Sequence, residues 1–172
     1  MGLKLVLPGD SAERPYELLK EKEHLDAAAQ LLPQAVVHAR EFHNFEDYGA
    51  ALLLEQVGGN VPRAAWKQVF VTLGSLHEVN IVHGDSRIRN CVLVEGSVRW
   101  IDFRTSAVVT DPSTIWPKRR DMETLLTSCF HEERSPISPH VEHWVGQYLG
   151  TSESAGATFD AFAAERTEQQ TA

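Results

Sequence analysis

Oxygen-bearing side chains lie close together in one short stretch of the chain. Residues 83–90 read His-Gly-Asp-Ser-Arg-Ile-Arg-Asn, which places a carboxylate at Asp85 and an amide at Asn90. A second carboxylate, Asp102, follows twelve residues after Asn90. Carboxylate and amide oxygens are ligands that a hard cation such as Mg²⁺ prefers, and a carboxylate can also take a proton from a hydroxyl group. The stretch therefore carries residue types suited to metal-assisted chemistry.

Two regular elements flank this stretch and would position it. Over residues 62–80 apolar side chains recur at helical spacing, which predicts an amphipathic helix that ends just before the stretch. Residues 92–94 and 98–101 are apolar runs on either side of a short turn, which predicts a β-hairpin. A tight loop followed by a hairpin can bring Asn90 and Asp102 to the same end of the structure.

The loop and the hairpin together resemble the catalytic core of the protein-kinase-like superfamily, whose pattern is H-R-D-x-x-x-x-N followed by a short hairpin and D-F-G. Here the first motif reads H-G-D-x-x-x-x-N, and the second, residues 102–104, reads D-F-R. H-G-D is similar to the small-molecule and atypical kinases of this superfamily. The resemblance implies that Asp85 orients a substrate hydroxyl and accepts its proton, and that Asn90 and Asp102 bind the Mg²⁺ that accompanies ATP.

The resemblance extends to the N-terminal part of the chain. Lys4 lies in a predicted strand, where the family's phosphate-pairing lysine would be, and Glu21 lies on a predicted helix, residues 14–32, where that lysine finds its ion-pair partner. Leu25, one turn further, matches the helix residue that packs on the D-F motif. The competing interpretation of Glu21 is one more acid on a solvated helix face.

Two further segments match the family by their order in the chain. Leu54, Glu55 and Val57 belong to a segment that resembles the hinge, whose backbone groups would bind the adenine of a nucleotide. Asp121 resembles the buried aspartate that begins the central helix of the family and hydrogen-bonds the catalytic loop.

The resemblance implies an α+β, protein-kinase-like fold. We expect a reduced N-lobe of about three strands and one helix in residues 1–57, a shortened and mainly helical C-lobe in residues 58–166, and a flexible tail in residues 167–172. Only three residues precede Lys4, too few for the two strands and the Gly-rich loop that cover the phosphates. We therefore expect weak ATP affinity, or a homodimer in which a second chain covers the nucleotide.

The D-F-R motif departs from the family at its third position. Arg104 replaces a glycine whose backbone freedom the family uses, so we expect unfavourable torsions at Arg104, or a contact between its guanidinium group and a phosphate. Only sixteen residues separate Arg104 from Asp121, which leaves no peptide-docking activation segment of ordinary length. The missing arginine of H-R-D also predicts that loop phosphorylation does not activate the protein.

Composition excludes several classes of function. A chain of 172 residues with 42% hydrophobic and 23% charged residues is ordinary for a globular protein. A net charge of −8 makes nucleic acid an unfavourable partner, and no apolar run approaches the roughly 20 residues that span a bilayer. Cys91 and Cys129 are too few for a disulfide framework or a four-ligand zinc site. We therefore expect a cytoplasmic protein without a membrane partner.

These observations lead to three hypotheses. The first is a minimal phosphotransferase that depends on ATP and Mg²⁺, with a protein as the leading substrate class. The second is a pseudokinase that regulates a partner protein as a binding module. The third is a small-molecule kinase, for which the acidic net charge would fit a cationic substrate.

Overall fold

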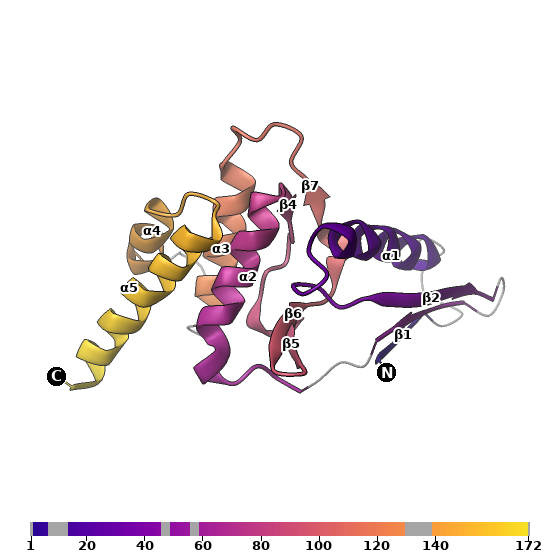
Figure 1. The fold of residues 1–172 in the computed structure, drawn as a ribbon, viewed down its shortest axis with the longest axis horizontal. Helices are drawn as coiled ribbons and strands as arrows, with labels where there is room; N and C mark the ends of the chain where they lie inside the picture. Colours follow the sequence, from indigo (N-terminus) through magenta and orange to yellow (C-terminus); the bar gives the residue numbers. More distant parts are fainter. Residues whose placement is uncertain (1, 7–13, 46–48, 56–58, 130–138, 172) are drawn as a thin grey trace.

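A computed structural model describes residues 2–6, 14–45, 49–55, 59–129 and 139–171. A three-stranded antiparallel sheet in the order β1-β3-β2 forms one end of the molecule (Figure 1). Its strands are β1 (Gly2–Val6), β2 (Ala39–Asn44) and β3 (Ala50–Leu54). β3 lies in the centre of the sheet, and its run of alanine and leucine is almost entirely buried.

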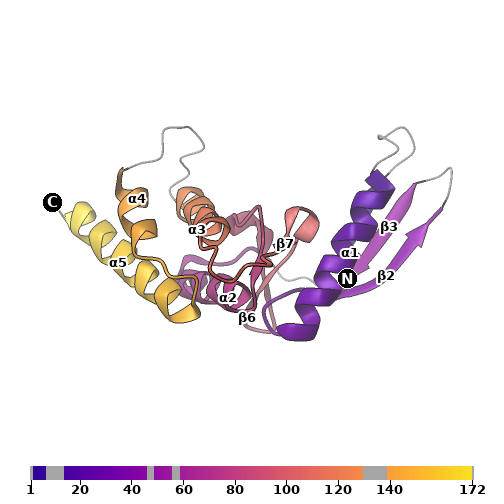
Figure 2. The same ribbon diagram turned by 90° about the horizontal axis from the view of Figure 1, so that it is seen from above.

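The helix α1 (Arg14–Leu31) packs against β2 and β3, and Figure 2 shows it running along the sheet. Proline suits the first turn of a helix, where its missing N–H costs nothing, and Pro15 lies there. The helix ends two residues before Pro33, because a residue that precedes proline is disfavoured in the helical region. Leu25 and Ala28, one turn apart on the inner face, are fully buried.

Helices form the other end of the molecule (Figure 1). They are α2 (Trp66–Glu78), which follows the 3-10 turn η2 (Arg63–Ala65), α3 (Trp116–Cys129), α4 (Pro139–Gly146) and α5 (Ser152–Thr171). The predicted stripe of α2 is confirmed, since Val69, Leu73 and Leu76 are fully buried. A Cβ atom at Gly74 would lie 2.6 Å from the Thr151 carbonyl oxygen, so a glycine there permits the start of α5 to lie against α2.

The short elements between α2 and α3 carry the two motifs. The predicted hairpin is confirmed as β5 (Cys91–Val94) and β6 (Ser97–Trp100), and the 3-10 turns η3 (Ile88–Asn90) and η4 (Phe103–Thr105) lie before and after it. A second small antiparallel pair is formed by β4 (Ile81–Val82) and β7 (Ala107–Val108). The hairpin turns at Glu95 and Gly96, both with positive φ, as its tight right-handed twist requires.

The apolar run of residues 35–37 predicts a strand, and the pattern of residues 122–130 predicts a short helix; both expectations need correction. Residues 35–37 are buried but form no regular strand. The Trp100 N–H donates to the Ala35 carbonyl at 2.9 Å, and the Val37 N–H donates to the Trp100 carbonyl at 3.0 Å. The strand instead begins at Ala39. The helix predicted from Met122 begins six residues earlier, at Trp116. Helix α5 continues to Thr171, and the flexibility of residues 167–172 stays a prediction.

The fold is thus a mixture of helix and strand, which confirms the α+β class at that level. No helix in the described part of the chain is both long enough and apolar enough to cross a bilayer.

Candidate functional site

Lys4 joins three elements that are far apart in the sequence. Its ammonium group lies 2.5 Å from Glu21 Oε1 on α1 and 3.1 Å from Asp102 Oδ1, just after β6. Glu21 is only 1% exposed, which excludes the solvated helix face. Burial raises the pKa of Glu21, and the nearby Lys4 ammonium opposes that rise. The ion pair predicted between Lys4 and Glu21 is therefore present, and it includes Asp102.

Asp102 has a left-handed backbone, with φ 66° and ψ 58°. Such torsions are uncommon outside glycine, cost about 1 kcal/mol or more, and are best tolerated by Asn and Asp. Arg104, in the 3-10 turn η4, is not among the described residues with positive φ, so the strain that we expected at Arg104 lies two residues earlier instead. Because the strained residue bears a carboxylate, the conformation sets where that carboxylate points.

Asn90 holds the other motif together. Its side-chain Nδ2 donates to the Asp85 carbonyl oxygen at 2.7 Å and to Asp85 Oδ2 at 2.9 Å. Its own carbonyl oxygen accepts the backbone N–H of Ile101 at 2.9 Å, which fixes the loop beside the residue before Asp102. The spacing of Asn90 and Asp102 therefore brings the two motifs together, as expected from the hairpin.

Two arginines flank Asp85. Arg87 Nε lies 3.0 Å from Asp85 Oδ1, and Arg89 Nη2 lies 3.8 Å from Asp85 Oδ2. The Asp85 side chain remains 29% exposed, so a hydroxyl group from solvent can reach its carboxylate. Neither arginine has a role predicted from the sequence, although their positions two and four residues after Asp85 are evident from the motif itself.

His83 supports the motifs from within the core. Its ring lies 4.9 Å from those of both Trp100 and Phe103. Burial lowers the pKa of His83, so the imidazole is neutral near pH 7. Its Nε2 lies 2.8 Å from the Ile101 carbonyl, which can only accept, and its Nδ1 accepts the Asp85 N–H at 3.3 Å. These two bonds place the proton on Nε2.

Asp121, at the second turn of α3, is the buried carboxylate beneath the loop. It accepts the backbone N–H of His83 at 2.6 Å and of Gly84 at 2.9 Å. The Ser86 hydroxyl donates to the Asp121 carbonyl at 2.6 Å. Burial alone would raise the pKa of Asp121, but hydrogen bonding and charge from His77, with smaller contributions from His83, outweigh it and hold the pKa below its usual value. The resemblance placed Asp121 in this position.

The Asp121 network continues to the helical end of the molecule, and this continuation is not predicted from the sequence. His77 Nε2 lies 3.1 Å from Asp121 Oδ2, and His77 Nδ1 lies 2.5 Å from the Tyr148 hydroxyl. Burial raises the pKa of Tyr148, so the phenol keeps its proton and can donate to Nδ1. The helical spacing of His77 on the buried face of α2 was the only sequence signal for this contact.

His24 connects α1 to the turn that follows Asp102. Its Nδ1 lies 3.1 Å from the Phe103 carbonyl and 2.7 Å from the Ser106 hydroxyl. Ser106 is buried, and its hydroxyl also donates to the Phe103 carbonyl at 2.8 Å. Leu25, beside His24, and Phe103 are both fully buried in the same core. His24 is not predicted from the sequence, because nothing in its spacing separates it from an ordinary helix-surface residue.

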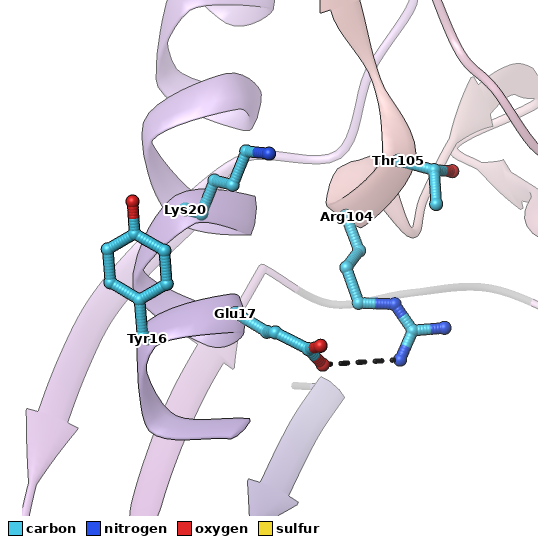
Figure 3. Close-up of a pocket in the computed structure, with 5 residues that line it drawn as sticks. All are labelled: Tyr16, Glu17, Lys20, Arg104 and Thr105. Carbon is cyan, nitrogen blue, oxygen red and sulfur yellow. Dashed lines mark ion pairs between the residues drawn. The ribbon is translucent and has the colours of Figure 1, made fainter. Parts of the chain in front are cut away.

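A hollow of about 490 Å³ lies between α1 and η4 (Figure 3). It is lined by side chains from α1 and η4, namely Tyr16, Glu17, Lys20, Arg104 and Thr105. Figure 3 shows the Arg104 guanidinium directed at the Glu17 carboxylate, 3.8 Å away. Arg104 thus contacts a carboxylate in this structure, and its contact with a phosphate stays a prediction.

The segment that resembles a hinge is described only in part, because Val57 lies outside the described residues. The backbone N–H of Glu55 donates to the His38 carbonyl at 2.9 Å, and its carbonyl accepts the Gly2 N–H at 3.3 Å. The Glu55 side chain pairs with Arg99, and Leu54 pairs within the sheet. The backbone of Glu55 is therefore already bonded within the protein.

The oxygen donors at the two motifs suit a magnesium ion better than a metal that is held by protein ligands alone. The described residues contain no group of three or more His, Cys, Asp or Glu side chains that could hold a metal. Mg²⁺ needs no such cage, since it takes one or two carboxylates together with waters and substrate phosphates. Because Asn90 donates to Asp85 through Nδ2, its Oδ1 remains as an oxygen donor.

Comparison with known proteins finds a short stretch of sequence similarity. No family model matches the chain. A 55-residue stretch, 32% of the chain, is 34% identical to a protein of Dictyostelium discoideum described as probable serine/threonine-protein kinase mps1, and it covers 6% of that protein. The similarity therefore connects one part of this chain with a small part of a protein kinase.

Proposed function

We propose that the chain is a kinase-like phosphotransferase that uses ATP and Mg²⁺. In this proposal residues 1–57 and 58–166 are the two lobes of a kinase-like arrangement, and the reaction takes place where they meet. The observation that carries the proposal is the ammonium group of Lys4, which contacts Glu21 and Asp102 together. The partial similarity to a serine/threonine kinase supports it.

Each residue of the proposed site has a separate task. Lys4, oriented by Glu21, binds the phosphates of the nucleotide, and Asn90 Oδ1 and Asp102 hold the metal. When bound, Mg²⁺ neutralises charge on the transferring phosphoryl group. Asp85 receives the substrate hydroxyl, and Arg87 and Asn90 keep its carboxylate in one orientation.

The proposed reaction is a displacement at the γ-phosphorus. The substrate hydroxyl oxygen forms a bond to this phosphorus while the bond from the phosphorus to the bridging oxygen of ADP breaks, and Asp85 takes the hydroxyl proton. Protein groups contribute placement and charge rather than covalent chemistry, as phosphoryl transfer requires.

The test combines nucleotide binding with phosphate transfer. Ligand that binds only the folded state raises stability, by about 2.7 kcal/mol at 100 times Kd. We expect Mg²⁺-ATP to raise the melting temperature of the wild-type protein and of Asp85→Asn, and to have little effect on Asp102→Ala. Transfer of labelled phosphate should occur only in the wild-type protein. Equal transfer by all three proteins would contradict the proposal.

A second candidate is a regulatory module that binds no nucleotide. It is favoured by the contact of Lys4 with Asp102 Oδ1, which places a cation of the protein on the proposed metal ligand, and by the bonded backbone of Glu55. The same titration separates the candidates, because a nucleotide-free module shows no shift in melting temperature with Mg²⁺-ATP.

A further inference from the structure

The charged groups around the proposed site form two clusters of opposite sign. In the first, the carboxylates of Glu21 and Asp102 share one cation, Lys4, which leaves an excess of one negative charge. In the second, the single carboxylate of Asp85 lies between the guanidinium groups of Arg87 and Arg89, which leaves an excess of one positive charge. The first cluster suits a metal cation, and the second suits an anion.

Arg89 is the most exposed member of the second cluster. Its side chain is 64% exposed, compared with 41% for Arg87. Its Nη2 lies 3.8 Å from Asp85 Oδ2, which is an ion-pair distance but too long for a hydrogen bond. A guanidinium group carries five N–H donors in a planar fork that matches a carboxylate. Arg89 therefore offers a group that can bind a carboxylate next to Asp85, the proposed base.

We propose that Arg89 binds an anionic side chain of the phosphoryl acceptor, and that the acceptor is an acidic peptide with a carboxylate close to its reacting Ser or Thr. This inference rests on the proposed function. The distances permit it, because an extended chain advances about 3.3–3.6 Å per residue. A Glu or Asp within two residues of the hydroxyl at Asp85 therefore lies within reach of the long Arg89 side chain.

The sign of the local charge matters more here than the net charge of the chain. The whole protein carries −8, which alone would favour a cationic acceptor. Charges further apart than about 8–10 Å are largely screened at physiological salt, whereas the Arg89 and Asp85 groups are in direct contact. A charged side chain of the acceptor that contacts Arg89 therefore interacts mainly with Arg89 and the groups directly around it.

The experiment uses two peptides that differ only in charge. Each has a single Ser, flanked by Glu in one peptide and by Lys in the other. Binding is measured by fluorescence anisotropy with the whole chain, Mg²⁺ and a non-hydrolysable ATP analogue, and transfer is measured separately with ATP. We expect the wild-type protein to bind the Glu peptide about fivefold more tightly, the order of an exposed ion pair, and added salt to reduce the difference.

Charge reversal gives the decisive comparison. Arg89→Glu should invert the preference, so that the Lys peptide binds more tightly, while nucleotide affinity stays unchanged. The matched control is Arg40→Glu, the same change at an exposed residue of β2, and it should keep the preference for the Glu peptide. The proposal is overturned if the wild-type protein binds neither peptide or has no preference, if both variants respond alike, or if Arg89→Glu weakens nucleotide binding and leaves peptide preference intact.

The two readouts separate this inference from the proposed function. Binding of the Glu peptide that depends on Arg89, without any phosphate transfer, would support the acidic ligand and contradict the phosphotransferase. Transfer to both peptides at equal rates, without a difference in binding, would support the phosphotransferase and overturn the role of Arg89.

Discussion

Lys4 and Asp102 are 98 residues apart in the sequence, yet Lys4 Nζ lies 3.1 Å from Asp102 Oδ1. The same ammonium group is 2.5 Å from Glu21 Oε1. The Lys4 side chain on β1 therefore connects α1 with Asp102, the strained residue after β6. The position of Lys4 between the two acids depends on both of them, since each carboxylate attracts it.

Replacing Glu21 with Gln should weaken nucleotide binding. Without the Glu21 charge, Lys4 is attracted to Asp102 alone, where it competes with the metal. We expect Kd for Mg²⁺-ATP to rise about tenfold, equivalent to about 1.4 kcal/mol, measured by calorimetry. Glu23→Gln, the same change at an exposed position of α1, is the control and should leave Kd unchanged. An equal effect of the two variants would contradict the role of Glu21.

His24 provides a second connection between α1 and the turn after Asp102. In His24→Phe the bonds to the Phe103 carbonyl and the Ser106 hydroxyl are lost, which should leave η4 less well fixed and weaken Mg²⁺-nucleotide binding several-fold. His24→Asn places a donor near the position of Nδ1 and should restore binding. If both variants bind nucleotide like the wild-type protein, His24 does not position Asp102.

The glycines Gly84 and Gly96 allow a paired test of how closely the loop approaches η4. Both have φ near +81°, but a Cβ atom at Gly84 would lie 2.3 Å from the Thr105 carbonyl oxygen, whereas nothing lies within 4 Å at Gly96. Gly96→Ala should cost about 1 kcal/mol for the torsion alone. Gly84→Ala should cost about 3 kcal/mol or more, because the backbone must also shift. Urea unfolding measures both, and equal losses would show that the approach is not tight.

The sequence predicted the elements whose signals are local. The stripe of α2, the start of α1 before Pro15 and the turn at Glu95 and Gly96 were all evident from spacing and turn chemistry. Residues 35–37 were misread as a strand, because a short apolar run has the same composition whether it pairs in a sheet or is buried in an irregular segment. Here its backbone bonds to Trp100, a distant residue that no local pattern identifies.

The candidate site was predicted only in part, for a similar reason. Asp85, Asn90 and Asp102 were found through motif spacing, and Lys4, Glu21 and Asp121 through chain order within the resemblance. His24 and Tyr148 were missed, because their partners lie more than 70 residues away and a single polar residue on a helix or loop carries no periodic signal. Side-chain contacts of this kind depend on the packing of whole elements.

Asp121 should be the most costly polar residue to change. As a carboxylate it accepts the N–H groups of both His83 and Gly84, and in Asp121→Asn one of these donors would face an NH₂ group. A buried donor without a partner costs about 1–3 kcal/mol, and more where a charged acceptor is lost. We expect about 3 kcal/mol in urea unfolding. Asp160→Asn, which removes only an exposed ion pair with Lys67, should cost less than 1 kcal/mol.

The neutral state of His83 predicts how stability changes with pH. Burial lowers the pKa of His83 in the folded protein below the usual 6.5, while charge from Asp121, the Ile101 hydrogen bond and the charges of Asp102 and Asp85 oppose that shift. Below pH 6.5 the unfolded chain therefore binds a proton that the folded protein does not. Stability should fall as pH decreases from 6.5 towards the folded pKa, by at most about 1.4 kcal/mol per pH unit for this one group.

The comparison that isolates His83 is His83→Gln, whose amide can still donate to the Ile101 carbonyl. The variant should be less stable at pH 7.5, because it loses the ring contacts with Trp100 and Phe103. Its loss of stability between pH 6.5 and 5.5 should be smaller than that of the wild-type protein, because the titrating group has gone. Parallel pH profiles for the wild-type protein and His83→Gln in urea unfolding would mean that His83 titrates equally in the folded and unfolded states, and that its ring is not held neutral by burial.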